Sequence, residues 1–164
     1  QFLDFSNTDS EDAIAAQVQD MASRRLLSPA AAEAADTARL LAFFRSPLGI
    51  RMRASQSVHR EFKFSLLACA RAASELSALA VPPAPDEDTI LFQGVIDCFF
   101  EEGDGLVLID FKSDRVREST VSMAIANYRP QLLAYSYALT RITGKPVLAR
   151  YLYFFNLNRE FPIA

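Results

Sequence analysis

The chain has 164 residues, of which 51% are hydrophobic and 23% are charged. This length and composition are typical of one globular domain and exclude a chain that is mainly disordered. The net charge at pH 7 is −3, which argues against electrostatic attraction of the whole chain to nucleic acid. Every apolar run is far shorter than the roughly 20 residues of a membrane span, so no membrane partner is expected.

The two cysteines, Cys69 and Cys98, are too few for a disulfide framework and lack the spacing of a zinc site. A buried, reduced thiol at Cys98 and a cytoplasmic location fit this pattern. The single histidine, His59, excludes an HExxH metalloprotease site, and no GxSxG elbow accompanies it. The chain starts at Gln1 with neither an initiator Met nor a secretory signal, so we expect a piece of a longer protein.

Residues 1–56 predict a helical part. The spacing of residues 8–11 (TDSE) is that of a capping box at the start of a first helix. Ser28-Pro29 predicts the start of a second helix, which continues through residues 30–44 without a break. Residues 48–52 predict one further short helical turn.

Residues 57–164 predict a sheet with one long helix. Alternating apolar residues indicate a strand over 58–64, whereas residues 66–79 are ambiguous and their alanine content favours helix. Residues 81–88 have the composition of a loop. The remaining prediction is strands over 90–100, 106–112 and 147–155, with a helix over 120–143 that ends at Gly144.

The hairpin made by residues 90–100 and 106–112 carries the candidate chemistry. Alternation places Asp110 and Lys112 on one face of their strand. A turn centred on residues 103–104 pairs Asp97 with Asp110, and a turn centred on residues 104–105 pairs it with Lys112. Both registers put the three side chains on one face, whereas a three-residue loop does not.

Two adjacent carboxylates in an apolar hairpin are destabilising unless one is protonated, the region is solvated or a cation neutralises both. A hard divalent ion such as Mg²⁺ suits such an oxygen-only site. Lys112 adds a positive charge that stabilises a phosphoryl transition state. This favours metal-assisted phosphodiester hydrolysis; the plainer alternative is a surface ion pair between Asp110 and Lys112.

Three more residues extend this candidate site. Glu61 lies on the polar side of the earlier strand and is a possible third carboxylate. Gln131 and Tyr135 are four residues apart and share a helical face. They suit contact with a DNA backbone or, alternatively, ordinary helix packing.

Asp97, Ile109-Asp110-Phe111-Lys112 and residues 128–135 (YRPQLLAY) together resemble the nuclease domain of the RecB/AddA helicase-nucleases, a branch of the PD-(D/E)xK superfamily. Residues 92–97 (FQGVID), 105–114 (GLVLIDFKSD) and 151–154 (YLYF) resemble the AddA type most closely. The resemblance covers most of the chain from about Arg60 and, more loosely, the helical part. It implies an α/β, restriction-endonuclease-like core: a mixed central sheet flanked by helices, with the site on the hairpin. It also implies a single RecB-like nuclease domain over residues 1–164, which we expect to be truncated at its N-terminus.

The resemblance implies roles for individual residues. Asp97, Asp110 and the backbone carbonyl of Phe111 would bind Mg²⁺, with Mn²⁺ as an alternative, and Lys112 would be the catalytic lysine. Glu61 would be the family's acidic residue on the first strand, and Gln131 and Tyr135 would form its substrate-binding Q-x₃-Y motif.

The implied function is a metal-dependent DNA exonuclease domain of a bacterial helicase-nuclease in double-strand-break repair and recombination. The expected partners are DNA and a second, AddB-like protein of the same complex, and ATP serves only the helicase part of a full-length protein. The family's metal-binding His falls just before the stretch that residues 1–5 resemble, so we expect weak or no cleavage by this chain. His59 does not match that position. A catalytically inactive scaffold or partner-binding module, and less so a stand-alone resolvase or restriction-type endonuclease, are the alternatives.

Overall fold

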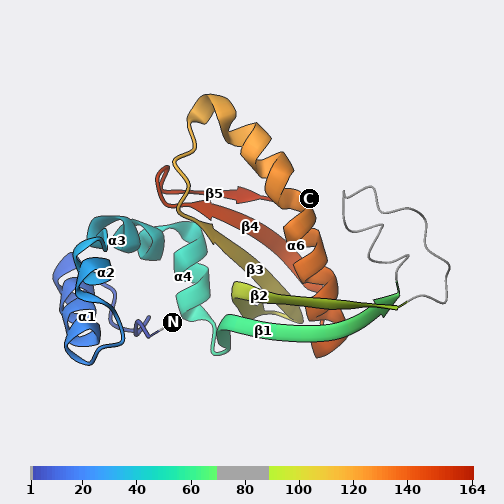
Figure 1. Ribbon diagram of the computed structural model, residues 1–164, viewed down its shortest axis with the longest axis horizontal. Helices are drawn as coiled ribbons and strands as arrows, with labels where there is room; N and C mark the ends of the chain where they lie inside the picture. Colours follow the sequence, from blue (N-terminus) through green and yellow to red (C-terminus); the bar gives the residue numbers. More distant parts are fainter. Residues whose placement is uncertain (1, 70–88) are drawn as a thin grey trace.

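The computed structural model describes residues 2–69 and 89–164, and a mixed five-stranded sheet forms its centre (Figure 1). The strand order is β1-β2-β3-β4-β5; β3 and β4 run parallel, and the other neighbours are antiparallel. The strands are β1 (Val58–Cys69), β2 (Thr89–Glu102), β3 (Gly105–Lys112), β4 (Val147–Phe154) and β5 (Arg159–Pro162). This confirms the predicted α/β, restriction-endonuclease-like class.

Helices cover both faces of the sheet. Four short helices precede it and gather near the N-terminus, and α6 lies along the opposite face (Figure 1). Their bounds are α1 (Glu11–Ser23), α2 (Pro29–Glu33), α3 (Thr37–Arg45), α4 (Pro47–Ala54), the 3₁₀ turn η1 (Glu118–Thr120) and α6 (Val121–Thr143). Within the described residues, no helix is long and apolar enough to cross a membrane.

Two predictions for the helical part are wrong in detail. The cap of α1 is Ser10, whose hydroxyl accepts a hydrogen bond from the Ala13 amide. Thr8 is buried, and its hydroxyl donates to the Phe5 carbonyl instead. The helix predicted to run without a break is divided into α2 and α3, because Asp36 accepts the Arg39 amide hydrogen bond and starts a new helix. Alanine content gave no sign of this second cap.

The strands agree with the predictions more closely. The hairpin pairs Glu102 with Gly105, so its turn is centred on residues 103–104, one of the two predicted registers. Gly103 has φ +58, which glycine adopts without steric cost. β1 continues to Cys69, beyond the predicted strand, and β5 was not predicted. The predicted loop over 81–88, and most of the ambiguous segment 66–79, lie outside the described residues.

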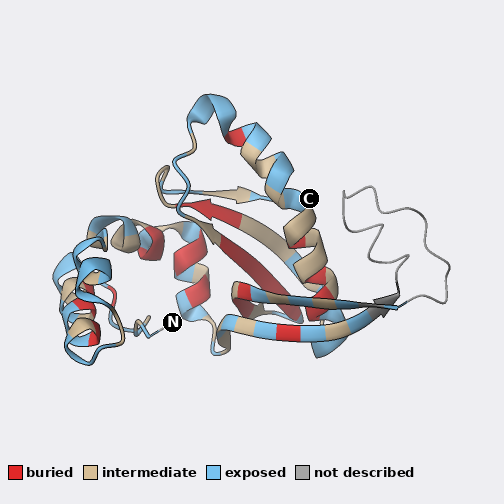
Figure 2. Cartoon of the chain, in the orientation of Figure 1, coloured by how far each residue is buried: buried red, intermediate tan, exposed pale blue. Residues whose placement is uncertain are grey.

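Alternation along the strands divides the core between the two faces. Val107, Ile109 and Tyr153 pack against the N-terminal helices, whereas Leu108 and Leu152 pack against α6. Figure 2 shows the buried residues concentrated in β3, β4 and the helix faces toward them. The centre of the sheet is therefore apolar on both sides, and a polar group there needs a partner.

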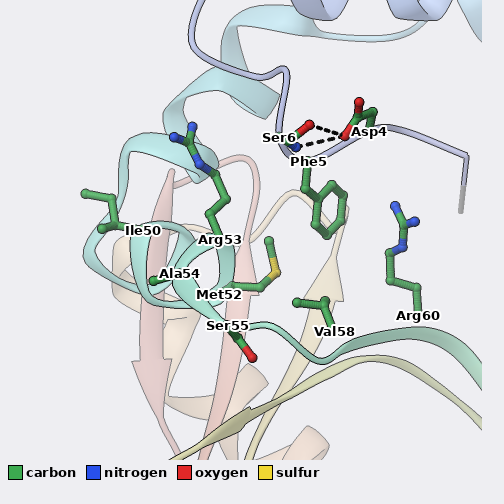
Figure 3. A pocket seen from close by; sticks show the side chains of 10 residues that line it. All are labelled: Asp4, Phe5, Ser6, Ile50, Met52, Arg53, Ala54, Ser55, Val58 and Arg60. Carbon is green, nitrogen blue, oxygen red and sulfur yellow. Dashed lines mark hydrogen bonds between the residues drawn. The ribbon is translucent and has the colours of Figure 1, made fainter.

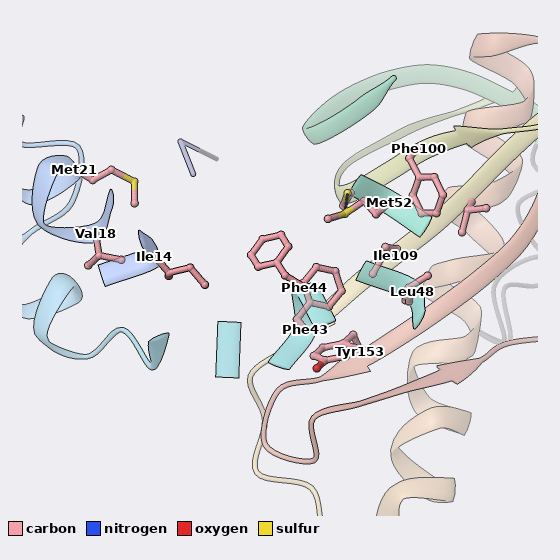
Figure 4. Packing of buried hydrophobic residues seen from close by; sticks show 12 residues of the cluster. Ile14, Val18, Met21, Phe43, Phe44, Leu48, Met52, Phe100, Ile109 and Tyr153 are labelled. Atoms are coloured by element: carbon pink, nitrogen blue, oxygen red, sulfur yellow. Dashed lines mark hydrogen bonds between the residues drawn. The ribbon is translucent and has the colours of Figure 1, made fainter. Parts of the chain in front are cut away.

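Phe43 on α3 joins the N-terminal helices to the sheet. Its ring centroid lies 4.8 Å from that of Tyr153, 5.0 Å from Phe111 and 5.3 Å from Phe44, all at edge-to-face angles. In Figure 4, Phe43 and Phe44 lie between the α1 side chains and those of the sheet. Aromatic pairs of this geometry add to the free energy of burial.

We expect Phe43→Ala to lower the free energy of unfolding by about 3–5 kcal/mol, because it removes a fully packed ring and leaves a cavity. Urea denaturation followed by circular dichroism measures the change. Ile50→Ala, at a side chain that is 57% exposed on α4, serves as control and should change little. An equal loss of unfolding free energy in the two variants would contradict the inference that Phe43 joins the helices to the sheet.

Arg51 on α4 binds the end of β2 through a two-pronged ion pair. Its Nε and Nη2 atoms donate to the two carboxylate oxygens of Glu102 at 2.9 and 2.7 Å, and Nη1 donates to the Tyr151 hydroxyl. The hydrogen bonds from Arg51 lower the pKa of Glu102 below its usual value. The charged form of Glu102 is thus favoured in the folded chain.

We expect Glu102→Gln to lower the free energy of unfolding at pH 7 by about 0.5–1 kcal/mol, since the pair is partly exposed. A lowered pKa stabilises the fold above the unfolded pKa of Glu102 and loses that effect as the pH falls through the folded pKa. The difference from the wild type should therefore vanish in acid. Urea denaturation at several pH values measures it, with exposed Glu33→Gln as control.

Candidate active site

The regular backbone pairing on both sides of β2 is interrupted at Asp97. Toward β3 the pairing ends at Cys98 and Ile109. Toward β1 it skips Glu61 and Asp97, and Glu61 has φ +52, a left-handed conformation that is unfavourable for a side chain with a Cβ. The interruption releases Asp97 from the ladder and lets its side chain take a backbone partner.

That partner is the β3 segment that carries the second aspartate. The observed register, extended by one residue, places Asp97 opposite Asp110. Phe111, the next residue, donates its backbone N–H to Asp97 Oδ2 at 2.9 Å. A side-chain carboxylate thus replaces a backbone carbonyl where the strands separate, and it fixes the two aspartates side by side.

The Asp110 carboxylate is buried at the end of the apolar strand β3. Only 2% of its side chain is exposed, and its Oδ2 atom lies 2.6 Å from Lys112 Nζ. The approach lacks hydrogen-bond geometry, so within the described residues this buried oxygen accepts no hydrogen bond. Burial raises the pKa of Asp110, the ammonium of Lys112 lowers it, and the charge of Asp97 raises it further.

Asp97 lines a small cavity together with Glu61. The cavity has a volume of about 230 Å³, and its other walls are Phe5, Arg60 and Phe111. Burial raises the pKa of Asp97, the Phe111 amide and Lys112 lower it, and the negative charge of Glu61 raises it. Both aspartates are therefore carboxylates that the fold disfavours in their charged form until a cation neutralises them.

Lys112 reaches from the hairpin to α6. Its Nζ donates to Gln131 Oε1 at 3.1 Å, and Gln131 Nε2 donates to the Tyr135 hydroxyl at 2.9 Å. The structure thus brings the two predicted helix residues together with Lys112. Gly94 leaves room for this arrangement, because a Cβ at that position would lie 2.9 Å from the Phe64 ring and 3.2 Å from the Tyr135 ring.

Two residues of this region, Tyr128 and Asp114, belong to the stretches that carry the family resemblance but were assigned no role in the site. The Lys112 ammonium lies 3.9 Å from the centre of the Tyr128 ring, and the Tyr128 hydroxyl donates to Asp114 Oδ2 at 2.7 Å. That hydrogen bond raises the pKa of Tyr128. Tyr128 lies three residues before Gln131, so helical spacing puts both on one face of α6, whereas no local pattern indicates Asp114 as the partner of Tyr128.

Arg60 covers the approach to Asp97 from the N-terminal side. Its guanidinium donates to the Leu3 carbonyl and lies 4.4 Å from the centre of the Phe5 ring. Figure 3 shows Arg60 and Arg53 flanking a larger cavity of about 620 Å³, which shares Phe5 and Arg60 with the small one. The N-terminal segment therefore forms part of the walls of both cavities.

His59 has a different environment from the aspartates. Its ring stacks on Phe99 with centroids 4.5 Å apart, and its Nε2 atom shares a hydrogen bond with the Ser57 hydroxyl. It is not among the residues that line the cavity at Asp97. Cys98 is a buried free thiol, as predicted, and burial raises its pKa to about 12.

The donor set at the strand separation fits a hard divalent cation. Asp110 Oδ2 is a buried oxygen that accepts no hydrogen bond from the part of the chain that the structure describes, and the neighbouring Asp97 supplies a second carboxylate. Oxygen ligands of this kind suit Mg²⁺, which commonly keeps several waters beside one or two carboxylates. The described residues contain no group of three or more His, Cys, Asp or Glu side chains arranged for a metal ion.

Comparison with known proteins agrees with this geometry. Residues 3–161 match a family model described as the PD-(D/E)XK nuclease superfamily, whose members generally use divalent metal ions. Within the matched range the chain has the D-x-K sequence at residues 110–112.

Similar proteins include several whose names describe them as one subunit of an ATP-dependent helicase/nuclease. Those from Acetivibrio thermocellus and Alkaliphilus oremlandii are 41% and 39% identical to this chain over 156 and 159 residues. That of Syntrophomonas wolfei is 37% identical over 163 residues. These matches cover 94%, 97% and 99% of the chain and 12%, 13% and 13% of the relatives, so the chain spans about an eighth of their length.

We expect Asp97→Asn to raise the free energy of unfolding of the metal-free chain by about 0.5–2 kcal/mol. The amide removes a partly buried negative charge beside Asp110 and Glu61, and its oxygen still accepts the Phe111 amide hydrogen bond. Urea denaturation in the presence of a chelator measures the change. Asp104→Asn, at an exposed turn residue, is the control. A destabilised Asp97→Asn chain would contradict the inferred repulsion.

Proposed function

The chain belongs to the PD-(D/E)XK nuclease superfamily, and from this premise we propose that it is a Mg²⁺-dependent DNA nuclease domain that hydrolyses phosphodiester bonds. The observation that carries the proposal is the convergence of Asp97, Asp110 and Lys112 where β2 separates from β3. Two raised carboxylate pKa values beside a nearly buried ammonium are typical of catalytic sites.

Asp97, Asp110 and the backbone carbonyl of Phe111 would hold the ion. When bound, it supplies positive charge that polarises the phosphate and favours ionisation of water. The Phe111 amide orients Asp97 for this, and Asp110 is held in place by β3, where it follows the four consecutive buried apolar residues 106–109. Mn²⁺ would fit the same ligands.

Lys112 would stabilise the negative charge that develops on the phosphate and orient the attacking water. A charged donor that is already in place does this without reorganisation during the reaction. Glu61, which lines the same cavity as Asp97, would add negative charge near the ion and strengthen its binding. Gln131 and Tyr135 would complete the substrate side of the site from α6.

We also propose an exonuclease role within a helicase-nuclease. The names of the similar proteins describe an ATP-dependent helicase/nuclease, which supports a role beside a part that unwinds DNA. Repair of DNA double-strand breaks in the cytoplasm is the role that the family resemblance implies. ATP would be used by a helicase part, and a second, AddB-like protein would be the partner. For the 164-residue chain itself we expect weak Mg²⁺ binding and slow cleavage, since two carboxylates and a carbonyl fill only about half of the octahedral coordination positions and leave the rest to water.

Calorimetric titration with Mn²⁺ and Mg²⁺ tests the metal site. We expect the wild-type chain to bind both ions and Asp97→Ala to lose binding at least about tenfold, because one of two carboxylate ligands is removed. Asp104→Ala, on the exposed turn of the same hairpin, should bind as the wild type does. Equal affinities in Asp97→Ala and the wild type would exclude Asp97 as a ligand.

A cleavage assay on end-labelled linear DNA tests the activity. We expect slow cleavage with Mg²⁺ or Mn²⁺, no cleavage with a chelator, and at least about a hundredfold loss in Asp110→Asn. An exonuclease leaves covalently closed circular DNA intact, so cleavage of circles would indicate an endonuclease. A chain that binds neither metal nor cleaves either DNA would instead support the scaffold alternative.

A further inference from the structure

We infer that Tyr128 is a positioning residue: its ring, fixed by Asp114, holds the ammonium group of Lys112 at the carboxylate pair. The inference rests on the proposed catalytic role of Lys112. It assigns a role to a side chain of α6 and to a residue that follows β3, both of which act on the aspartates through the lysine.

The ammonium of Lys112 lies between three groups from two elements. Asp110 Oδ2 is at 2.6 Å, Gln131 Oε1 at 3.1 Å and the centre of the Tyr128 ring at 3.9 Å. The side chain is only 13% exposed. A lysine side chain has a flexible four-carbon stem and loses about 2 kcal/mol of rotamer entropy when it is fixed, so several contacts are needed to hold it in one place.

The contact with Tyr128 differs in kind from the other two. An aromatic ring attracts the cation through its face and offers no strong acceptor lone pair. It therefore holds the ammonium without adding negative charge that would compete with a phosphate oxygen for the same cation. Gln131 alone would restrict the movement of the ammonium on one side, and the Tyr128 ring restricts it on another.

Tyr128 is itself fixed at its far end. Its hydroxyl donates to Asp114 Oδ2 at 2.7 Å, and Asp114 is only two residues beyond Lys112 on the chain. The lysine, the ring and the aspartate thus form a closed unit that joins the end of β3 to α6. The ring also lies 6.4 Å from that of Phe154, so a purely structural role in packing is the competing explanation.

Nuclear magnetic resonance of the metal-free chain separates these explanations. The chain has three lysines, Lys63, Lys112 and Lys145, so lysine labelled with ¹³C gives three ε-methylene signals. We expect the Lys112 protons to be shifted upfield of the other two by the ring current of Tyr128. Lys63→Arg and Lys145→Arg assign the signals, and both residues lie outside the proposed site.

Three variants give matched comparisons. Tyr128→Leu should abolish the upfield shift. Asp114→Ala and Tyr128→Phe each remove the hydrogen bond between residues 114 and 128 but keep the ring, so both should reduce the shift without abolishing it. Tyr137→Leu makes the same change elsewhere on α6 and should leave the Lys112 signal unchanged. An unshifted Lys112 signal in the wild type, or an unchanged one in Tyr128→Leu, would overturn the inference. If Tyr128→Leu does not fold, Asp114→Ala decides: an unchanged shift in that variant overturns the inference.

The cleavage assay adds the functional half of the test. We expect Tyr128→Leu to lower kcat by about tenfold with KM unchanged, since the ring acts on Lys112 and not on DNA binding. Tyr128→Phe should retain most of the activity. An unchanged kcat in a folded Tyr128→Leu chain would overturn the inference. A wild-type chain without cleavage under any metal would instead contradict the proposed function, and the resonance shift would still decide the placement of Lys112.

Discussion

The buried carboxylate of Asp110 is the constraint on which the site depends. Removing a carboxylate from water is unfavourable by several kcal/mol, and one ammonium at 2.6 Å offsets this only in part. The fold therefore needs Lys112 in a defined position, which in turn needs α6 against the same face of the sheet. Gln131 and Tyr128 connect these two requirements, because both contact the lysine from that helix.

The sheet provides the rigidity for this arrangement. Residues 105–110 of β3 are all buried, and the strand pairs with β2 on one side and β4 on the other. Side chains alternate between the N-terminal helices and α6, so Asp110 follows Leu108 on the α6 face while Phe111 packs toward Phe43. Shifting β3 by one residue would exchange the two faces, so packing on both sides fixes where the carboxylate points.

The hairpin and the shared face of Gln131 and Tyr135 could be predicted from the sequence, because each follows from the residue period of a strand or a helix. Alternation and a two-residue turn limited the partner of Asp97 to Asp110 or Lys112, and the structure has the first of these registers. Helical spacing put Gln131 and Tyr135 on one face. The break in the pairing at Asp97 was not predictable in the same way. It depends on the left-handed backbone of Glu61 in β1 and on the hydrogen bond that the Phe111 amide in β3 donates to the Asp97 carboxylate. The prediction of one unbroken helix over residues 30–44 was wrong for a related reason. The alanine-rich segment favours helix throughout, and Asp36 starts α3 through a single capping hydrogen bond.

The two aspartates set folding and function against each other. Without a cation, their charges repel and each pKa is raised by burial, so the pair destabilises the fold. A cation that binds the folded chain removes this penalty and adds its own binding free energy to stability. Part of the intrinsic affinity for the ion is thus the relief of a repulsion that the sheet maintains. A hairpin with neutral residues at these positions would fold more readily but would offer the ion nothing to neutralise.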